Sequence, residues 1–174
     1  MTREVEVRRH TDDEDDVLSE EGVFQALEIG RKLRGNYELV VSSGAQRATQ
    51  TAACFLAGLG QAVPGGVVVN AGLRSDREDR WKEAYQEAGS GELSAFRSVA
   101  PDFVEEEADR LGSALREVIE TLPEGGRALV VGHSPTNEAA VFGLTGEEVG
   151  PLSDGAGVLL VEEDGAYRVE PLDS

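Results

Sequence analysis

The alternation of short apolar runs with amphipathic segments is the feature that most constrains how this chain can fold. Strand-like runs occur in "EVEVRR", "YELVVSS", "GGVVVNAG" and "GGRALVVGH". Segments with apolar residues at helical spacing lie between them, at about residues 19–35, 45–60 and 103–122. Helices that separate strands favour an α/β fold, in which helical layers cover a mostly parallel sheet.

The C-terminal part of the chain departs from this alternation. "AGVLLVEEDGAYRVEPL" predicts two strands around Asp164-Gly165, a dipeptide typical of tight hairpin turns. The sheet should therefore carry an antiparallel edge. Because the sequence shows neither repeats nor linkers, we expect residues 1–174 to form one domain. The charged, glycine-broken segment at about 73–100 is predicted to be a small excursion from that domain.

The charge of the chain limits its partners. The formal net charge of -18 repels phosphate backbones, so a nucleic-acid partner is not expected. Salt screens exposed charges over roughly 8 Å, so a local group of arginines can still bind an anion. A single cysteine, Cys54, is predicted to be a buried filler, which favours a reducing compartment. Neither a secretory segment nor an apolar run of membrane-spanning length is present, so we expect a cytoplasmic protein without membrane contact.

Polar residues follow three of the predicted strands, in "VRRH", "VVSSGAQR" and "VVGHS". Ligands of open parallel sheets bind beyond the carboxyl ends of the strands, so Arg9, His10, Arg47 and His133 should meet at one rim. Both histidines of the chain would then share a site with two arginines. Arg8 alternates with Arg9 along the strand, so it is predicted to point away and to serve as a surface residue.

These residue types suit the chemistry of phosphate. Arginines bind oxyanions through paired N–H groups. A neutral imidazole is a nucleophile toward phosphorus, and the phosphorylated histidine that results can be hydrolysed. Guanidiniums and a second imidazole would stabilise the charge on the oxygens of the group in transfer.

Three motifs in the chain resemble those of the histidine phosphatase superfamily, the phosphoglycerate-mutase-like group. "RRHTDDEDDVLSEEGVFQA" resembles the family opening of Arg-His with a later D-x-x-L-[ST]-x-x-G-x-x-Q-A segment. "SSGAQRATQTA" is similar to the second motif, and "VVGHSPTNEAA" to the third, which is built around Gly-His. All three occur in family order, from the start of the chain to about residue 144.

The resemblance implies a three-layer α/β/α sandwich and a reaction without metal or organic cofactor. It implies His10 as the nucleophile and Arg9, Arg47 and His133 as the phosphate pocket. Neighbouring Thr11 and Ser134 would also contact the substrate, which would be a small phosphorylated molecule or a phosphorylated protein. The short chain is most similar to compact phosphohistidine phosphatases or to a minimal phosphomonoesterase.

The chain departs from the family pattern at three places. Thr11 stands where the family usually has glycine, and the acidic run at residues 12–16 is expected to face solvent. The family often places a glutamate in an L-R-E context as general acid, and the matching position here is Ser75. Asp76 or Glu78 would then be the acid, or the site has none, which would favour phosphohistidine substrates.

These residues do not fit other functional classes. "GHSPT" lacks the second glycine of a hydrolase elbow, and no histidine follows Ser134, as a catalytic triad of that class requires. The acidic run does not match a calcium-binding loop. The histidines and the single cysteine do not form a zinc-binding cluster. The leading hypothesis is a metal-independent phosphatase. The alternatives are a non-catalytic phosphoryl-ligand binding module and a mutase, for which the segment around Ser90-Gly91 predicts too little cover.

Overall fold

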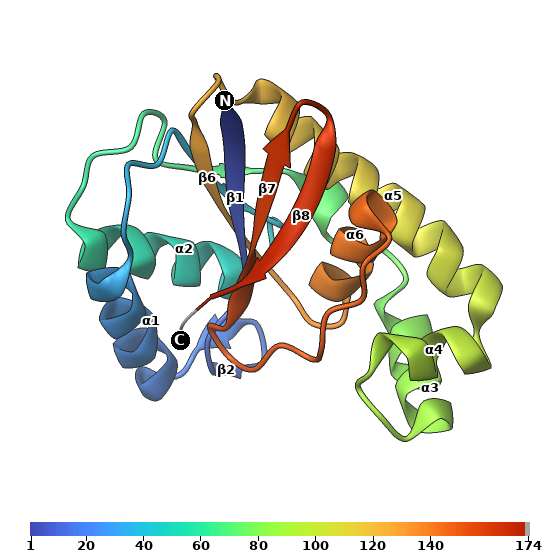
Figure 1. Cartoon of the computed structure of the whole chain (residues 1–174). Helices are drawn as coiled ribbons and strands as arrows, with labels where there is room; N and C mark the ends of the chain where they lie inside the picture. Colours follow the sequence, from blue (N-terminus) through green and yellow to red (C-terminus); the bar gives the residue numbers. More distant parts are fainter. Residues whose placement is uncertain (173–174) are drawn as a thin grey trace.

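Six strands form the central sheet of a computed structural model that describes residues 1–172 (Figure 1). Their order across the sheet is β5-β4-β6-β1-β7-β8. The strands β5, β4, β6 and β1 pair in parallel, whereas β7 is antiparallel to β1, and β8 to β7. The mostly parallel sheet with an antiparallel edge is therefore confirmed. The bounds are β1 Thr2–Arg9, β4 Leu39–Ser42, β5 Val67–Val69, β6 Arg127–Gly132, β7 Gly157–Glu163 and β8 Ala166–Pro171.

Helices cover both faces of the sheet and complete the three layers. The helices α1 (Glu20–Lys32) and α2 (Gln46–Leu59) lie on one face, and α5 (Pro101–Thr121) and α6 (Thr136–Thr145) on the other (Figure 1). Since successive strand residues point to opposite faces, Leu129 of β6 packs into the core under α2, while the next residue, Val130, packs into the core under α5. Within residues 1–172, no helix is both long and apolar enough to cross a membrane.

Local sequence signals account for several element ends. Ser19 caps α1 as predicted, because its hydroxyl accepts a hydrogen bond from the amide of Gly22 at 3.0 Å. The hairpin turn between β7 and β8 has positive φ at both Asp164 (53°) and Gly165 (82°), which a type I′ turn requires. Helix α1 ends at Lys32, earlier than Gly35 suggested, because Leu33 is already extended.

The segment at 73–100 contributes more buried residues to the core than its charged sequence predicted. It contains α3 (Glu78–Ala88) and α4 (Leu93–Val99). The rings of Trp81 and Phe96 lie edge to face with centroids 5.4 Å apart, and both side chains are buried. The two helices therefore extend the core on the α5 side.

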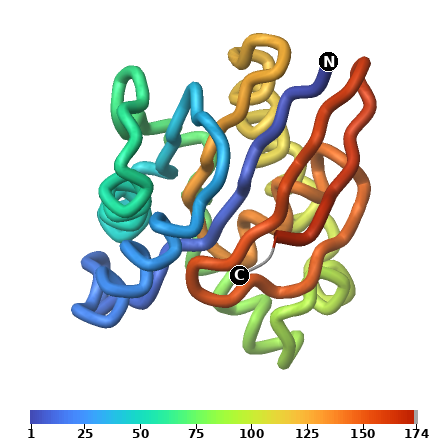
Figure 2. The backbone as a smooth tube through the Cα atoms, turned by 60° about the vertical axis from the view of Figure 1, so that its left-hand side comes forward, coloured from blue at the N-terminus to red at the C-terminus, as the bar shows by residue number. Residues whose placement is uncertain are grey.

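Arg8 corrects the expectation of a surface role, since only 5% of it is exposed. Its Nε donates to Glu6 Oε2 at 3.0 Å and its Nη1 to the carbonyl of Gly155 at 2.9 Å. Glu6 and Arg8 share a face of β1, which lies between β6 and β7 in the middle of the sheet (Figure 2). The sequence could not reveal this, because the carboxylate that pairs with Arg8 is itself buried in the strand.

Candidate active site

The two histidines of the chain lie side by side at the carboxyl edge of the parallel strands. His10 follows β1 and His133 follows β6, which pair in register at Arg9 and Gly132. The ring centroids are 5.3 Å apart with an angle of 64° between the planes. Arg47 joins them from the first turn of α2, which begins after β4. The convergence that the strand ends predicted is present in the structure.

His10 is positioned by the backbone next to it. Its Nδ1 lies 2.8 Å from the carbonyl oxygen of Thr11, which can only accept a hydrogen bond. The proton of the neutral ring therefore belongs on Nδ1, and Nε2 keeps its lone pair. Burial lowers the pKa of His10, opposed by the Thr11 carbonyl and by Asp13 and assisted by nearby guanidiniums. A neutral ring with an unprotonated Nε2 is the form a nucleophile needs.

His133 is bound from both of its ring nitrogens. Its Nε2 lies 2.7 Å from Ser43 Oγ, and its Nδ1 accepts from Arg47 Nη2 at 3.2 Å. Because Arg47 can only donate, the proton of the neutral ring lies on Nε2. Burial, then the charge of Arg47, lowers the pKa of His133 to about 3, so this ring is neutral near pH 7.

Both arginines are anchored by oxygens of neighbouring residues, and Arg9 Nε also lies 3.7 Å from Asp154 Oδ1. Arg9 Nη1 donates to the carbonyl of Leu152 at 2.8 Å, and its buried Nε has no hydrogen-bond partner among the described residues. Arg47 Nη1 donates to Asp16 Oδ1 at 2.8 Å. Such anchors fix the planes of the guanidiniums, which can then present further N–H groups to an anion.

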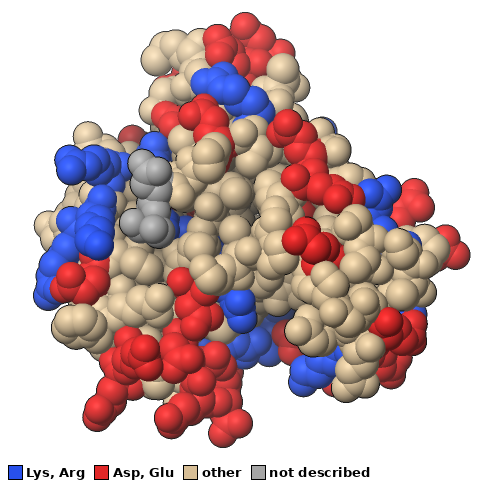
Figure 3. Space-filling view, turned by 60° about the horizontal axis from the view of Figure 1, so that its bottom comes forward, with Lys and Arg blue, Asp and Glu red and all other residues tan. Residues whose placement is uncertain are grey.

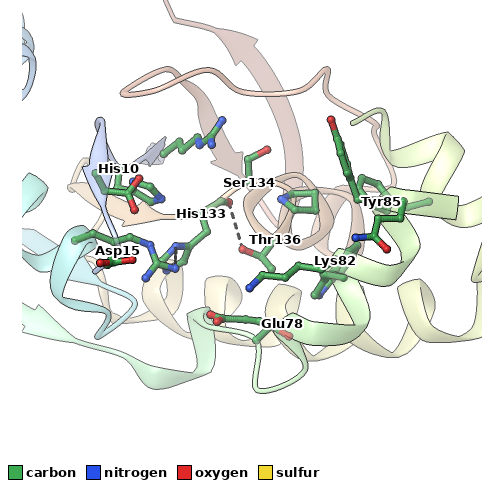
Figure 4. Close-up of a pocket in the computed structure, with 16 residues that line it drawn as sticks. His10, Asp15, Glu78, Lys82, Tyr85, His133, Ser134 and Thr136 are labelled. Carbon is green, nitrogen blue, oxygen red and sulfur yellow. Dashed lines mark hydrogen bonds and ion pairs between the residues drawn. The ribbon is translucent and has the colours of Figure 1, made fainter. Parts of the chain in front are cut away.

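A cavity of about 610 Å³ opens over these side chains (Figure 4). Its two ends differ in chemistry: one carries the histidines and arginines, and the other carries residues of α3 and α4. Residues of the 73–100 segment line the second end, so this segment forms a wall of the site. The residues that line the two ends include Arg9, His10, Arg47, His133 and Ser134 at the first and Glu78, Trp81, Lys82, Tyr85 and Phe96 at the second.

The acidic run is exposed at Glu14, Asp15 and Asp16, as its composition predicted, but it also borders the site, which was not expected. It forms a small hairpin of β2 (Asp13–Glu14) and β3 (Val17–Leu18). Asp13 and Asp15 line the cavity and Asp16 pairs with Arg47, whereas Glu14 is exposed outside it. The N-terminus of α2 and its arginine attract the carboxylate of Asp16. Figure 3, which brings this edge forward, shows acidic side chains gathered around a few basic ones.

The two neighbours expected to contact substrate have different positions. Thr11 is fully buried, and its hydroxyl donates to the carbonyl of Gly22 at 2.8 Å. Its side chain therefore points toward α1, away from the cavity, and the structure does not bring it to the site. Ser134 lines the cavity and donates a hydrogen bond to Glu138 of α6.

The structure separates the two candidates for the general acid. The side chain of Asp76 is 82% exposed, lies 3.7 Å from Arg110 and does not line the cavity, so the choice of Asp76 is contradicted by its position. Glu78 does line the cavity, where its Oε1 accepts from Arg74 Nε at 3.0 Å. Ser75, at the family position of the acid, donates to the buried Glu107.

Two buried carboxyl groups near the site were missed from the sequence: Glu107 of α5 and Glu138 of α6. The signal was present in principle, since each acid falls on the apolar face of its helix. Glu138 in particular stands in "TNEAAVFG" among small and apolar residues. An acid at such a position is either buried with a partner or part of a site.

An α/β sandwich that gathers two imidazoles and two guanidiniums at one sheet edge defines a class of phosphoryl-transfer proteins. The family model of the histidine phosphatase superfamily (branch 1) matches residues 2–154. The chain therefore belongs to this superfamily, as its three motifs predicted.

Solved structures share the fold over nearly the whole chain. A phosphoglycerate mutase from Bacillus anthracis aligns with a TM-score of 0.76 at 19% identity, covering 98% of this chain and 92% of the mutase. A mycobacterial glucosyl-3-phosphoglycerate phosphatase aligns at 0.65 and 19%, covering both chains fully. A mutant phosphoserine phosphatase from Entamoeba histolytica, in complex with phosphoserine, aligns at 0.66 and 18%, covering 96% of this chain and 94% of its own. A search of curated proteins found no match.

Proposed function

We propose that this protein is a metal-independent phosphatase that hydrolyses a phosphomonoester or a protein phosphohistidine through a phosphohistidine intermediate on His10. One observation carries the proposal: the Thr11 carbonyl holds the proton of His10 on Nδ1, so that Nε2 is free beside a cavity lined by two arginines. A nucleophile with a fixed tautomer next to an anion pocket is what covalent phosphoryl transfer requires.

In the first step, oxygens of the phosphoryl group bind to Arg9 and Arg47, and Nε2 of His10 attacks phosphorus. The N–P bond forms as the bond from phosphorus to the leaving atom breaks. The guanidiniums of Arg9 and Arg47 stabilise the charge on the oxygens in transfer. His133 keeps the guanidinium of Arg47 in place, because its Nδ1 accepts a hydrogen bond from Arg47 Nη2. In the second step, water attacks phosphorus and releases His10.

The side chains near the leaving group favour a substrate whose leaving group departs without a strong acid. Ser75 stands where the family often has the acidic residue, and its hydroxyl donates a hydrogen bond to Glu107. Glu78 is engaged with Arg74. A phosphoramidate has less need of a strong acid at this point, because a protonated imidazole leaves readily. A cavity of about 610 Å³ admits either a small phosphorylated molecule or a phosphorylated side chain.

A mutase is the second candidate, because α3 and α4 form a wall of the cavity where the sequence suggested little cover. Retention of the intermediate against water needs such cover. A coupled assay distinguishes the two functions. If the protein converts phosphoglycerate to its isomer faster than it releases inorganic phosphate, the result would favour the mutase.

The His10→Ala variant tests the proposal. Wild type and variant are assayed with p-nitrophenyl phosphate in EDTA, and we expect the variant to lose roughly a thousandfold or more of kcat, since removal of a covalent nucleophile is rarely compensated. Glu14→Gln is the matched control, because Glu14 is exposed on the acidic hairpin outside the cavity.

Two results would overturn the phosphatase proposal. One is equal activity of wild type and His10→Ala. The other is a wild-type protein that binds phosphate but turns over no member of a panel of phosphoesters and phosphoramidates, which would identify a binding module.

A further inference from the structure

Glu138 is a buried carboxyl group that the mechanism above does not use. It lies on α6, one turn after Ser134, and only 1% of it is exposed. Its Oε2 accepts a hydrogen bond from the Ser134 hydroxyl, whereas Oε1 is buried without a hydrogen-bond partner among the described residues. A carboxylate so placed is costly unless it is protonated, because no hydrogen bond replaces the water that Oε1 has lost.

The groups around Glu138 offer it little compensation. Burial raises its pKa to about 7, opposed by the Ser134 hydroxyl, the backbone of Leu152 and the charge of Arg9 on β1. Helix α5 packs closely on α6 through its small residues, among them Gly112. The buried acid of α5, Glu107, is bonded to Ser75 and Trp81. Arg9 is thus the charged group that faces Glu138 from the sheet.

Ser134 connects this carboxyl group to the cavity. It lines the cavity next to His133, and Figure 4 shows it on the side turned toward Tyr85 and Lys82, with His10 on the other side of His133. In-line phosphoryl transfer places the leaving atom opposite the attacking Nε2 of His10. A phosphoryl group bound between His10 and the α3 end of the cavity has its leaving oxygen on the side where the Ser134 hydroxyl lies.

We propose that Ser134 protonates the leaving group and that Glu138 supplies the proton through the Ser134 hydroxyl. This inference rests on the proposed phosphatase function and names the source of its acid. Ser134 is the catalytic residue, since it touches the substrate, and Glu138 is the positioning residue that acts through it. The pair takes the place of the glutamate that Ser75 replaces and of Asp76, which lies outside the cavity.

The proton transfers balance over the cycle. When Glu138 is protonated at Oε2, it donates to Ser134 Oγ, and the Ser134 proton can point into the cavity. As the bond from phosphorus to the leaving oxygen breaks, that oxygen takes the proton of Ser134 Oγ, and Ser134 takes the proton of Glu138, which becomes a carboxylate. In the second step, water attacks the phosphohistidine and gives a proton back to Glu138 through Ser134. The N–P bond breaks, inorganic phosphate forms, and both residues return to their starting states.

The test uses Glu138→Gln and Ser134→Ala with two substrates of similar shape, p-nitrophenyl phosphate and phenyl phosphate. Phenolate is the poorer leaving group, so it depends more on an acid. We expect both variants to lose at least about tenfold more kcat with phenyl phosphate than with p-nitrophenyl phosphate. In the wild type, kcat for phenyl phosphate should fall above pH about 7, and Glu138→Gln should lack this decline.

Asp76→Asn is the control, because Asp76 is exposed outside the cavity and its loss should not change the ratio between the substrates. Vanadate binding by each variant checks that the anion pocket is intact. An active wild type whose two variants keep the same substrate ratio and the same alkaline decline would overturn the Ser134–Glu138 proposal alone. A wild type inactive on both substrates and on phosphoramidates would overturn the phosphatase proposal with it.

Discussion

Individual side chains in this protein show how burial fixes charge. Glu6 and Glu138 are both buried, with opposite results. Arg8 and Arg127 surround Glu6, and with the Tyr37 hydroxyl they outweigh burial and lower the pKa of Glu6. At Glu138 burial outweighs the Ser134 hydroxyl, nearby backbone groups and the charge of Arg9, and it raises the pKa to about 7. The first carboxyl is a fixed ion, while the second can exchange a proton near neutral pH.

The same contrast predicts a pH-dependent effect of Glu138→Gln on stability. The pKa of Glu138 in the folded state, about 7, lies above its ordinary value of 4.5, so its stabilising effect is present below pH 4.5 and is lost as the pH rises through 7. A shift of this size corresponds to up to about 3 kcal/mol. Relative to wild type, the variant should therefore gain up to about 3 kcal/mol on going from pH 5 to pH 8.

Urea unfolding of both proteins at the two pH values measures this difference. The contribution of His133, whose low pKa makes the fold less stable as the pH falls below 6.5, is common to both proteins and cancels. A difference in unfolding free energy that does not change between the two pH values would contradict the burial argument.

At the scale of elements, α3 and α4 decide the shape of the site. They are attached to α5 through Glu107, whose Oε1 accepts from Trp81 Nε1 at 2.9 Å and from the Ser75 hydroxyl. Trp81 in turn packs on Phe96 and on Phe103 of α5. One buried carboxylate thus connects the wall of the cavity to the helix layer beneath it.

Removal of this connection should loosen the wall. Glu107→Ala leaves two buried donors, the indole N–H of Trp81 and the O–H of Ser75, without an acceptor, so we expect a loss of about 2–4 kcal/mol of unfolding free energy. Glu106→Ala, at the neighbouring position, removes a 69% exposed acid and should change stability by less than about 0.5 kcal/mol. Thermal or urea unfolding measures both. Equal effects of the two substitutions would show that the buried network does not hold the wall.

At the scale of the whole molecule, the net charge of -18 opposes an anionic substrate until it reaches the arginines. Acidic residues also surround the site itself, where Asp13 and Asp15 line the cavity. The long-range repulsion of the substrate weakens as salt is added. The contacts of the substrate with Arg9 and Arg47 depend less on salt, because both arginines are partly buried.

Added salt should therefore lower the KM for an anionic substrate, whereas it would raise the KM of a protein that binds anions at a basic surface. Between about 10 mM and 150 mM NaCl the screening length falls from roughly 30 Å to 8 Å. We expect the KM for p-nitrophenyl phosphate, a dianion at pH 8, to decrease over this range. Steady-state kinetics at fixed pH measures it, with sodium acetate in place of NaCl as a check on specific anion effects. A KM that rises with either salt would show that local attraction outweighs the field of the whole molecule.

The sequence alone determined the α/β architecture, the antiparallel edge of the sheet and the edge at which His10 and His133 meet, but not the helices α3 and α4. Periodic apolar patterns and turn residues act over a few positions along the chain, and parallel strands must end at a common edge. The same logic placed Arg9 and Arg47. These features depend on neighbours in sequence and on general rules of topology, so they can be read without coordinates.

Only the tertiary structure decided which carboxyl groups belong to the site. The sequence favoured Asp76 as the acid and solvent for the run at residues 12–16, but Asp76 points outward while Asp13 and Asp15 face the cavity. It gave no role to Glu138, which lies buried behind Ser134. The charge state of an acid depends on the water it loses and on partners brought from distant strands and helices, and local sequence contains neither quantity.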